Sequence, residues 1–432
     1  MAEAITRTCS TQYDQSVLKA LESKYLDTDH NEDYIKTAGI QIMHNLTSIK
    51  AGGITLPQCL ALNYCHISKA GDAGRLHELC RRVRELDIAE NDLKDWNEVV
   101  NIINQIPHLE FLNLSSNPLN CKMDLHPRPT TQFTSLKRLA LNNTKVPWET
   151  TYDLLDIMPG VEELHLSLND YRNIPSTPNN KTYPQLHMLQ FNENHISQWE
   201  QLCPLGRAFP QLTSLILIGN KICGKITPEV TANFPKLCCL NLTNTCMQSW
   251  EELETLNNFP ALVDVRLQGI PFCENMQEKE RRQLCIARLG NVTRLNGSQV
   301  KDTEREDAER AFIRYYMDSA TKPERYDELI KKYGHLDRLA VVDLRPPNNV
   351  KITLQFEEKS EVMFISVKQT IKEFKRRVAK FACVPSTKLR LFYGDQDINM
   401  PGCESWQELL YHTRMVYTLQ VKDGDRFMLV RR

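Results

Sequence analysis

The chain has 432 residues, of which 41% are apolar and 25% are charged, and a length of this order allows roughly two or three globular domains. Its formal net charge of −1 shows no bias towards nucleic acid or a membrane surface. No apolar run approaches the roughly 18 residues of a membrane span, and the first residues lack the apolar core of a secretory signal. We therefore expect a cytoplasmic protein that binds neither nucleic acid nor membranes.

The 14 cysteines leave two interpretations. In a secreted, disulfide-rich protein the Asn-x-Ser/Thr sequences at Asn113 and Asn241 would be glycosylation sites. We favour reduced thiols in a cytosolic protein, because no C-x-x-C pair occurs and because Cys238 and Cys239 fall in a strand-like segment. The two sequons are then chance products of the repeats.

A short pattern recurs along the chain. Nine segments fit the template L-x-x-L-x-L-x-x-N with small departures, and they start at residues 57, 83, 109, 136, 161, 186, 212, 237 and 262. The spacing of 25 to 27 residues predicts a leucine-rich repeat solenoid, in which each coil contributes one short parallel strand. The Asn at the ninth position, as at 91, 117, 169, 194 and 220, is expected to tighten the turn and to bond the next coil.

The residues between the leucines of each template face outwards from the strand. We expect them to form the concave face of the solenoid and to bind a client protein there. Phe111, Met188 and Ile216 have no evident role in the core, and such side chains are typical of interfaces. The alternative is that loops or convex helices cover them. The candidate residues are Phe111, Arg138, Glu163, His165, Met188, Ile216 and Arg266.

Four of the five tryptophans are spaced by 51 or 52 residues, namely Trp96, Trp148, Trp199 and Trp250. Each is followed closely by an acidic residue, as in SWEEL at 249–253, which suits the first turn of a helix because negative charge meets the positive end of the helix dipole there. We predict helices on the convex side with the tryptophans packed between them. A stacked tryptophan row used for binding is the less favoured interpretation.

Beyond the ninth coil, VTRLNG (292–297) is expected to form a last, truncated strand. A helix that covers the open end of the solenoid should follow, since Thr303 and Glu306 form a capping-box pattern. Its packed face is predicted to hold Ala308, Ala311, Phe312, Tyr315 and Tyr316. A second short helix is predicted at 323–334, and the Pro- and Asn-rich segment 343–349 is predicted to be an interdomain linker.

The C-terminal residues predict four strands and one helix. Residues 350–356 and 361–367 alternate like a hairpin, 370–382 carry a helical apolar stripe, 389–395 form a third strand, and 415–430 supply the last strand after Gly424. The order β-β-α-β-β resembles ubiquitin and its β-grasp fold.

Arginines are the candidate binding residues of this ubiquitin-like domain. Arg390 is expected near the place where ubiquitin has a binding isoleucine, and Arg376 and Arg377 lie in the basic run KEFKRRVAK at 372–380. Two interpretations of this run stay open. It is either the solvated face of the helix, which we favour, or a site for an acidic partner.

No motif of an enzyme or of a cofactor site occurs in the sequence. The phosphate-binding, dinucleotide-binding, zinc-protease and nucleophile-elbow patterns are all absent, and no paired Cys/His spacing suits a metal. His165 and His187 have no nucleophile motif beside them. We therefore expect a binding protein with no catalytic, cofactor-binding or metal-binding residues.

The combination of these parts resembles the tubulin-folding cofactor E family. The matching stretches include ELDIAENDLKDWNEV, RLNGSQVKDTEREDAERAFIRYY, YDELIKKYG and VKDGDRFML. Full cofactor E has an N-terminal CAP-Gly domain with a GKNDG-like motif, and residues 1–55 contain no such motif, so the chain is similar to the cofactor E-like branch of the family.

The resemblance implies a chaperone-like, cytoskeleton-associated regulator that binds tubulin, either the α/β heterodimer or one subunit, and destabilises the heterodimer. It also implies proteasome or ubiquitin-pathway components as further partners. A ubiquitin-pathway adaptor with the solenoid as its client-binding module is the alternative. We expect an α/β leucine-rich repeat solenoid followed by an α+β ubiquitin-like domain, with a segment at 1–55, the solenoid at 56–300, cap and joint helices at 301–345 and the ubiquitin-like domain at 349–432.

Overall fold

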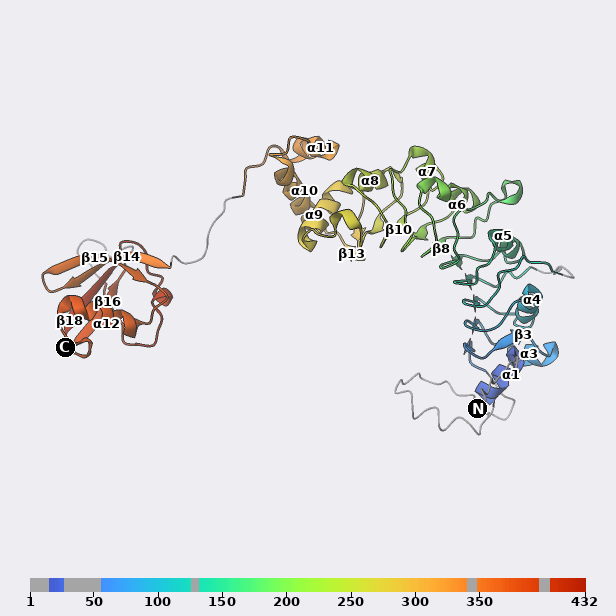
Figure 1. The fold of residues 1–432 in the computed structure, drawn as a ribbon, viewed down its shortest axis with the longest axis horizontal. Helices are drawn as coiled ribbons and strands as arrows, with labels where there is room; N and C mark the ends of the chain where they lie inside the picture. Colours follow the sequence, from blue (N-terminus) through green and yellow to red (C-terminus); the bar gives the residue numbers. More distant parts are fainter. Residues whose placement is uncertain (1–14, 27–55, 126–131, 340–347, 396–404) are drawn as a thin grey trace, which may run out of the picture. The chain divides into compact units, whose positions relative to one another are not determined.

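The structure is a computed structural model that describes residues 15–26, 56–125, 132–339, 348–395 and 405–432 (Figure 1). The chain divides into two compact units, residues 1–337 and 338–432. Each unit has a hydrophobic core of its own. None of the helices in the described ranges is long and apolar enough to cross a lipid bilayer.

One sheet runs through the first unit. Over the described residues it has eleven strands, which follow one another in sequence order. All neighbouring strands are parallel except the last pair, which is antiparallel. The strands are β2 (Cys59–Ala61), β4 (Glu85–Asp87), β5 (Phe111–Asn113), β6 (Arg138–Ala140), β7 (Glu163–His165), β8 (Met188–Gln190), β9 (Ser214–Ile216), β10 (Cys239–Asn241), β11 (Asp264–Arg266), β12 (Arg294–Leu295) and β13 (Ser298–Gln299).

The template leucines build the core of this solenoid. The middle residue of each strand points inwards, and Leu86, Leu112 and Leu164, for example, have no exposed surface. Burying one such side chain stabilises the folded state by about 1.5–3 kcal/mol. The repeat places each of these leucines next to the equivalent residue of the following coil. The strands begin two residues after each predicted template start, so the predicted solenoid is confirmed.

Two features close the coils after their strands. In five coils the ninth template position is a buried asparagine that bridges coils; Asn91, for example, accepts hydrogen bonds from the N–H groups of Cys65 and Ile67 and donates to the carbonyl of Leu62. The residue before the ninth position has a left-handed backbone with φ between 49° and 71° in all nine coils. The residues in this left-handed row are Tyr64, Glu90, Ser116, Asn143, Leu168, Glu193, Gly219, Asn244 and Gly269.

Helices cover the outer side of the solenoid, and the strands line its inner side (Figure 1). Each of the four spaced tryptophans is the first residue of its helix, and acidic residues occupy each first turn, as predicted. The helices are α3 (Ala73–Leu79), α4 (Trp96–Asn104), α5 (Trp148–Ile157), α6 (Cys203–Ala208), α7 (Pro228–Ala232), α8 (Trp250–Glu254), and the short η2 (Pro178–Asn180), η3 (Trp199–Leu202), η4 (Thr255–Asn258) and η5 (Pro271–Cys273).

The tryptophans are packing residues. Trp96, Trp148 and Trp199 are almost fully buried, and the indole N–H groups of Trp96 and Trp199 donate to carbonyls of the next coil, at Cys121 and Gly224. Trp250 is half-buried. Trp250 nevertheless packs against the core and lies edge-on to Phe272, so the packing interpretation is confirmed for all four, and they form no exposed tryptophan row.

The N-terminal residues that are described cap the first coil. Strand β1 (Gln15–Ser16) pairs with β3 (Ile67–Lys69), and helix α1 (Val17–Leu21) with the turn η1 (Glu22–Leu26) follows. Val17 and Leu21 are fully buried in the solenoid core. The rest of the predicted segment 1–55 lies outside the described residues.

Three helices close the other end: α9 (Glu278–Arg288), α10 (Asp302–Tyr316) and α11 (Glu324–Tyr333). The predicted capping box was wrong, because α10 begins at Asp302 after Lys301, which makes no side-chain capping bond. The predicted packed face was partly wrong, since Tyr315 is 51% exposed whereas Glu309 is buried. Most of the predicted linker lies outside the described residues, and the predicted domain boundaries stay predictions.

The second unit is a mixed five-stranded sheet with one long helix, which agrees with the predicted β-grasp fold. The strand order is β15-β14-β18-β16-β17, with β14 and β18 parallel. The last predicted strand, after Gly424, is confirmed, whereas the strand at 407–408 and the short helix at 416–419 were not predicted. The elements are β14 (Asn349–Phe356), β15 (Lys359–Ser366), α12 (Ile371–Ala382), η6 (Ser386–Lys388), β16 (Leu389–Gly394), β17 (Gln407–Glu408), η7 (Val416–Leu419) and β18 (Arg426–Arg431).

Candidate functional site

The outward residues of the parallel strands form two continuous rows, which together we call the strand face. The pairing register aligns equivalent positions of successive coils without a shift from β4 to β11. All seven predicted solenoid site residues therefore lie on this face. The first row is Glu85, Phe111, Arg138, Glu163, Met188, Ser214, Cys239 and Asp264, and the second is Asp87, Asn113, Ala140, His165, Gln190, Ile216, Asn241 and Arg266.

The part of the strand face nearest the N-terminus is a charged cluster. The guanidinium of Arg138 lies over the ring of Phe111, 4.6 Å from its centroid, and bonds Glu85 at 2.7 Å. The thiol of Cys59 donates to Glu85 at 3.4 Å, and burial, followed by that carboxylate, raises the pKa of this thiol. Phe111 is thus covered on one face by a cation, so it does not act as an isolated apolar anchor.

Beside this cluster, Glu163 and His165 form a pair within one strand. Glu163 Oε1 lies 2.6 Å from His165 Nε2, and the two side chains are only 27% and 19% exposed. Because Glu163 and His165 are each other's polar partner, fewer of their polar atoms are available to bind a client protein.

The middle of the strand face is uncharged. Across β8, β9 and β10 the outward residues are neutral, and Met188, Ile216 and Cys239 are half-buried. Ile218, two residues beyond Ile216, also faces outwards and is half-buried. Burial raises the pKa of the Cys239 thiol, so this residue stays neutral. We call Met188, Ile216, Ile218 and Cys239 the apolar patch.

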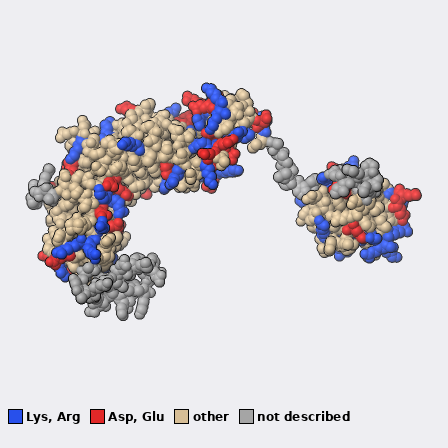
Figure 2. Space-filling model, turned by 180° about the vertical axis from the view of Figure 1, so that it is seen from behind, with Lys and Arg blue, Asp and Glu red and all other residues tan. Residues whose placement is uncertain are grey.

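The strand face carries charged side chains again at its C-terminal end. Asp264 lies 3.8 Å from Arg294 of β12, and Arg266 is exposed beside them. Figure 2 shows charged side chains gathered towards both ends of the solenoid, with fewer of them between the ends. The sequence-based prediction missed Ile218 and Arg294. The alternation of LILIG carried the signal for Ile218, and the strand-like VTRLNG carried the signal for Arg294.

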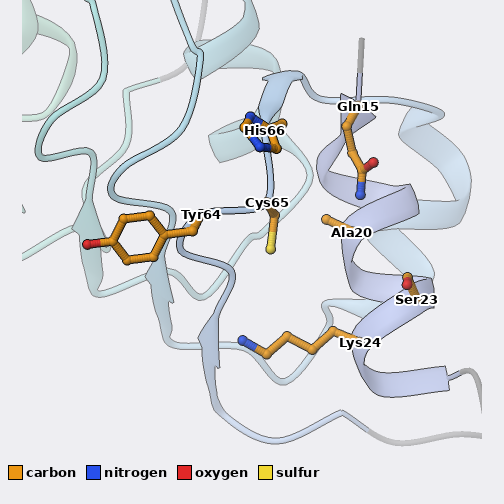
Figure 3. A pocket seen from close by; sticks show the side chains of 7 residues that line it. All are labelled: Gln15, Ala20, Ser23, Lys24, Tyr64, Cys65 and His66. Carbon is orange, nitrogen blue, oxygen red and sulfur yellow. The ribbon is translucent and has the colours of Figure 1, made fainter. Parts of the chain in front are cut away.

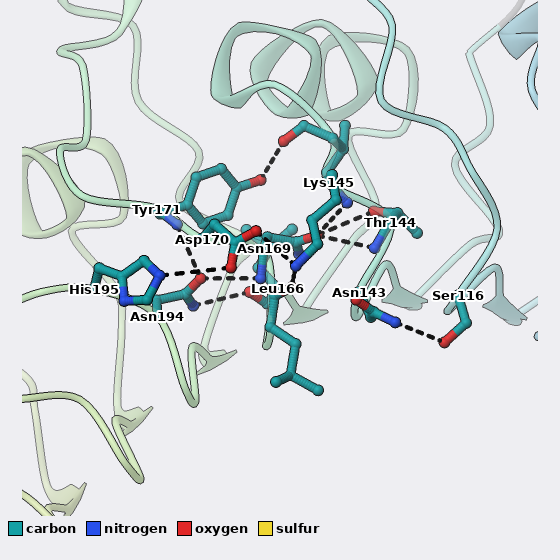
Figure 4. A network of polar contacts seen from close by, with 12 residues as sticks. Ser116, Asn143, Thr144, Lys145, Leu166, Asn169, Asp170, Tyr171, Asn194 and His195 are labelled. Carbon is teal, nitrogen blue, oxygen red and sulfur yellow. Dashed lines mark hydrogen bonds and ion pairs between the residues drawn. The ribbon is translucent and has the colours of Figure 1, made fainter.

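A polar ladder borders the strand face at the turns that follow β6, β7 and β8 (Figure 4). Asp170 lies 2.8 Å from Lys145 and 3.6 Å from His195. The hydrogen bond from Lys145 holds the pKa of Asp170 below its usual value. Next to the ladder, the buried Asn169 and Asn194 accept hydrogen bonds from backbone N–H groups of the turns. These bonds hold the turns that carry the ladder.

A cavity of about 350 Å³ lies between the N-terminal cap and the first coil. Figure 3 shows its lining, Gln15, Ala20, Ser23, Lys24, Tyr64, Cys65 and His66. Two of its polar side chains are engaged, because Lys24 donates to the Ala61 carbonyl and His66 contacts Asp92. Burial raises the pKa of the Cys65 thiol, so it is a poor nucleophile. Within the described ranges no group of three His, Cys, Asp or Glu side chains could hold a metal ion.

The structure does not bring the three arginines of the ubiquitin-like unit together. Arg376 and Arg377 are exposed on α12, which packs on one side of the sheet. Arg390 points to the other side of β16, since its neighbours Leu389 and Leu391 are buried, and it is paired with Glu408 at 2.7 Å. Arg377 donates to the Phe364 carbonyl at 3.1 Å.

Comparison with known proteins finds a matching family model and several similar proteins. A family model described as leucine-rich repeat matches residues 156–323. The human tubulin-specific chaperone cofactor E-like protein is 40% identical over 377 residues, which cover 86% of this chain and 87% of that protein. The Caenorhabditis elegans protein of the same name is 29% identical over 98% of this chain and 94% of its own length. A solution structure of the C-terminal ubiquitin-like domain of mouse tubulin-specific chaperone E is 17% identical over 21% of this chain and 93% of that chain, with a TM-score of 0.18.

Proposed function

The chain belongs to the family of tubulin-specific chaperone cofactor E-like proteins, and we propose that it binds tubulin and destabilises the α/β heterodimer, which limits microtubule polymer. It acts in the cytoplasm, by binding and without catalysis. The proposal is supported by the strand face, a continuous two-row surface that suits a protein client. Its apolar patch is the single observation that carries the choice of site.

Met188 and Ile216 are the contact residues that we propose for tubulin. They come from adjacent strands, β8 and β9, and adjacent strands lie about 4.8 Å apart. On either side of them, the pair of Glu163 with His165 in β7 and the ion pair of Asp264 with Arg294 border the patch. An apolar centre with a polar rim is the usual anatomy of a protein interface.

Destabilising a heterodimer requires more than binding it. A ligand shifts an equilibrium only by the difference between its affinities for the two states. The protein must therefore bind a separated tubulin subunit more tightly than the intact dimer. The strand face would do so if it contacted tubulin surface that the dimer covers.

The test is the double variant Met188→Ala with Ile216→Ala, mixed with purified tubulin. Removing two central anchors should weaken binding by about 2 kcal/mol or more, and dimer loss measured by native gel electrophoresis should fall accordingly. Both side chains are half-buried, so circular dichroism should show a retained fold.

The matched control is Tyr315→Ala with Val362→Ala, which removes exposed apolar side chains that are not part of the strand face. This control should keep full activity on tubulin. Unchanged dimer loss with the folded Met188/Ile216 variant would refute the site, and an inactive wild-type protein would refute the function.

A second candidate is an adaptor that brings clients to the ubiquitin pathway. The supporting observation is that residues 338–432 form a compact unit with an ubiquitin-like strand order. Deleting residues 338–432 separates the two functions. The adaptor proposal expects loss of client degradation with client binding retained, whereas the tubulin proposal expects dimer loss to continue.

A further inference from the structure

One row of cations runs along the exposed side of helix α12. Lys372, Arg376 and Lys380 are each exposed and lie four residues apart. Residues at this spacing occupy successive turns of the same helix face. We call these three residues the basic helix row.

The row is carried on a well-anchored element. Ile371, Phe374 and Val378 of α12 are buried in the domain core. The helix begins with a capping box, in which the Glu373 carboxylate accepts from the Thr370 N–H at 2.8 Å and the Glu373 N–H donates to the Thr370 hydroxyl at 3.2 Å. The cations are therefore presented by a rigid helix rather than by a loop.

The row differs from Arg390 and Arg431 of the same domain in forming no ion pair among the residues that the structure describes. Arg390 is paired with Glu408, and Arg431 with Glu357 at 3.2 Å. In the described residues Lys372, Arg376 and Lys380 form no ion pair. Glu373 is the one acid of α12; its carboxylate accepts a hydrogen bond from Thr370 and also attracts Arg376.

The surroundings of the row add further positive charge. Arg377 is exposed on the next position of the helix. Lys375 of the same helix is buried, and burial, followed by the nearby Arg432, lowers its pKa against the opposing attraction of Glu408. Like charges in one place repel one another, so an anionic ligand would relieve the repulsion.

We propose that the basic helix row binds an acidic polypeptide segment in an extended conformation. Successive cations of the row are about 6 Å apart along the helix axis, at about 1.5 Å per residue. Alternate residues of an extended chain repeat at about 6.6 Å and point to the same side. A segment with acids at every second position therefore matches the row cation by cation.

A nucleic acid is the less suitable ligand. Proteins that bind nucleic acid usually show a strongly basic charge balance, and single strands are held by aromatic stacking beside the cations. This chain has a net charge of −1, and the exposed residues of α12 are charged and contain no aromatic ring. Lys372, Arg376 and Lys380 instead offer separate point charges that suit carboxylates.

The test measures binding of the full-length protein to a fluorescent peptide of alternating Glu and Ser residues, by fluorescence anisotropy. The triple variant Lys372→Gln, Arg376→Gln and Lys380→Gln should bind at least about tenfold more weakly. Binding by the wild type should weaken steeply with added salt, because the contacts are exposed ion pairs.

The matched control changes the same number of charges elsewhere in the domain, by Lys351→Gln, Lys359→Gln and Lys388→Gln, all exposed. It should keep binding within about threefold, and both variants should show wild-type thermal unfolding. Equal weakening by both variants would overturn the proposal, as would no binding by the wild type or tighter binding of an oligouridylate of equal charge. The peptide contains no tubulin sequence, so this outcome is independent of the tubulin proposal.

Discussion

Asn194 is one step of the asparagine ladder, and its side chain serves backbone groups of two coils. Its carbonyl oxygen accepts from the N–H groups of Asn169 and Tyr171 at 3.1 and 3.2 Å. Its amide donates to the carbonyls of Leu166 and Phe191 at 3.1 and 3.2 Å. The side chain is 3% exposed, so water cannot replace these bonds.

We predict that Asn194→Ala strongly destabilises the solenoid. Each buried backbone group left without a partner costs about 1–3 kcal/mol, and at least two such groups result. Urea unfolding followed by circular dichroism measures the loss. Asn101→Ala is the matched control, because Asn101 is exposed on α4, and it should be neutral or slightly stabilising. Equal stability of the two variants would contradict the role of the ladder.

Glu309 is a buried acid in the cap, and its charge joins α10 to α11. The carboxylate is 1% exposed and accepts from Lys332 and Tyr333, both at 2.7 Å. Burial by itself would raise the pKa of Glu309, but the hydrogen bonds from Lys332 and Tyr333 outweigh it, and the pKa is lowered. The folded state therefore favours the ionised form.

We predict that the cap loses stability in acid. Because the folded pKa of Glu309 is lowered, its stabilisation is fully present above the ordinary carboxyl value of about 4.3 and is lost as pH falls through the lower folded value. Glu309→Gln should be destabilised at neutral pH and should lose less stability on acidification, measured by urea midpoints. Glu306→Gln, on the exposed face of the same helix, should behave like wild type at both pH values.

At the scale of elements, the two ends of the sheet need different protection. Strand β2 would be an open edge, but the hydroxyl of Tyr25 accepts from the Ala61 N–H at 3.1 Å and Lys24 donates to the Ala61 carbonyl at 2.8 Å. At the far end, β13 folds back on β12 as an antiparallel pair. Open edges invite pairing with other chains. These caps therefore oppose association of the solenoid with other chains at its ends.

We predict that Tyr25→Phe opens the first coil locally. Losing one hydrogen bond of this kind costs about 1 kcal/mol, and amide hydrogen exchange in residues 59–69 should become faster while later coils stay protected. Tyr64→Phe removes a hydroxyl from a residue that is 74% exposed, and it should leave exchange unchanged. Unaltered exchange in the Tyr25 variant would rule out this cap.

At the scale of the whole molecule, hydrophobic contacts decide which parts unfold together. The cap cluster around Phe312 shares Trp250 and Met276 with the solenoid core, and the cluster of the ubiquitin-like unit shares no residue with either. We predict that residues 349–432 expressed alone unfold in one cooperative thermal transition. A fragment without a cooperative transition would contradict the predicted boundary.

The sequence by itself determined the repeating parts of this protein. The position of each strand, the inward leucines, the two outward rows and the tryptophan-led helices all follow from residues within one coil, because a coil contacts chiefly its neighbours and the neighbours carry the same pattern. The ubiquitin-like unit was predictable in the same way from local alternation, except for the short strand Gln407–Glu408 and the short helix Val416–Leu419, which were not predicted.

Only the tertiary structure decided which outward residues stay available. Phe111 looked like a free anchor in the sequence, but Arg138 from the next coil covers its ring and is held there by Glu85. The burial of Glu309 and the cap formed by Tyr25 likewise depend on partners from other elements, Lys332 and Ala61. Contacts between residues far apart in sequence have no local pattern, and this is the physical reason why the strands could be predicted and the composition of the site could not.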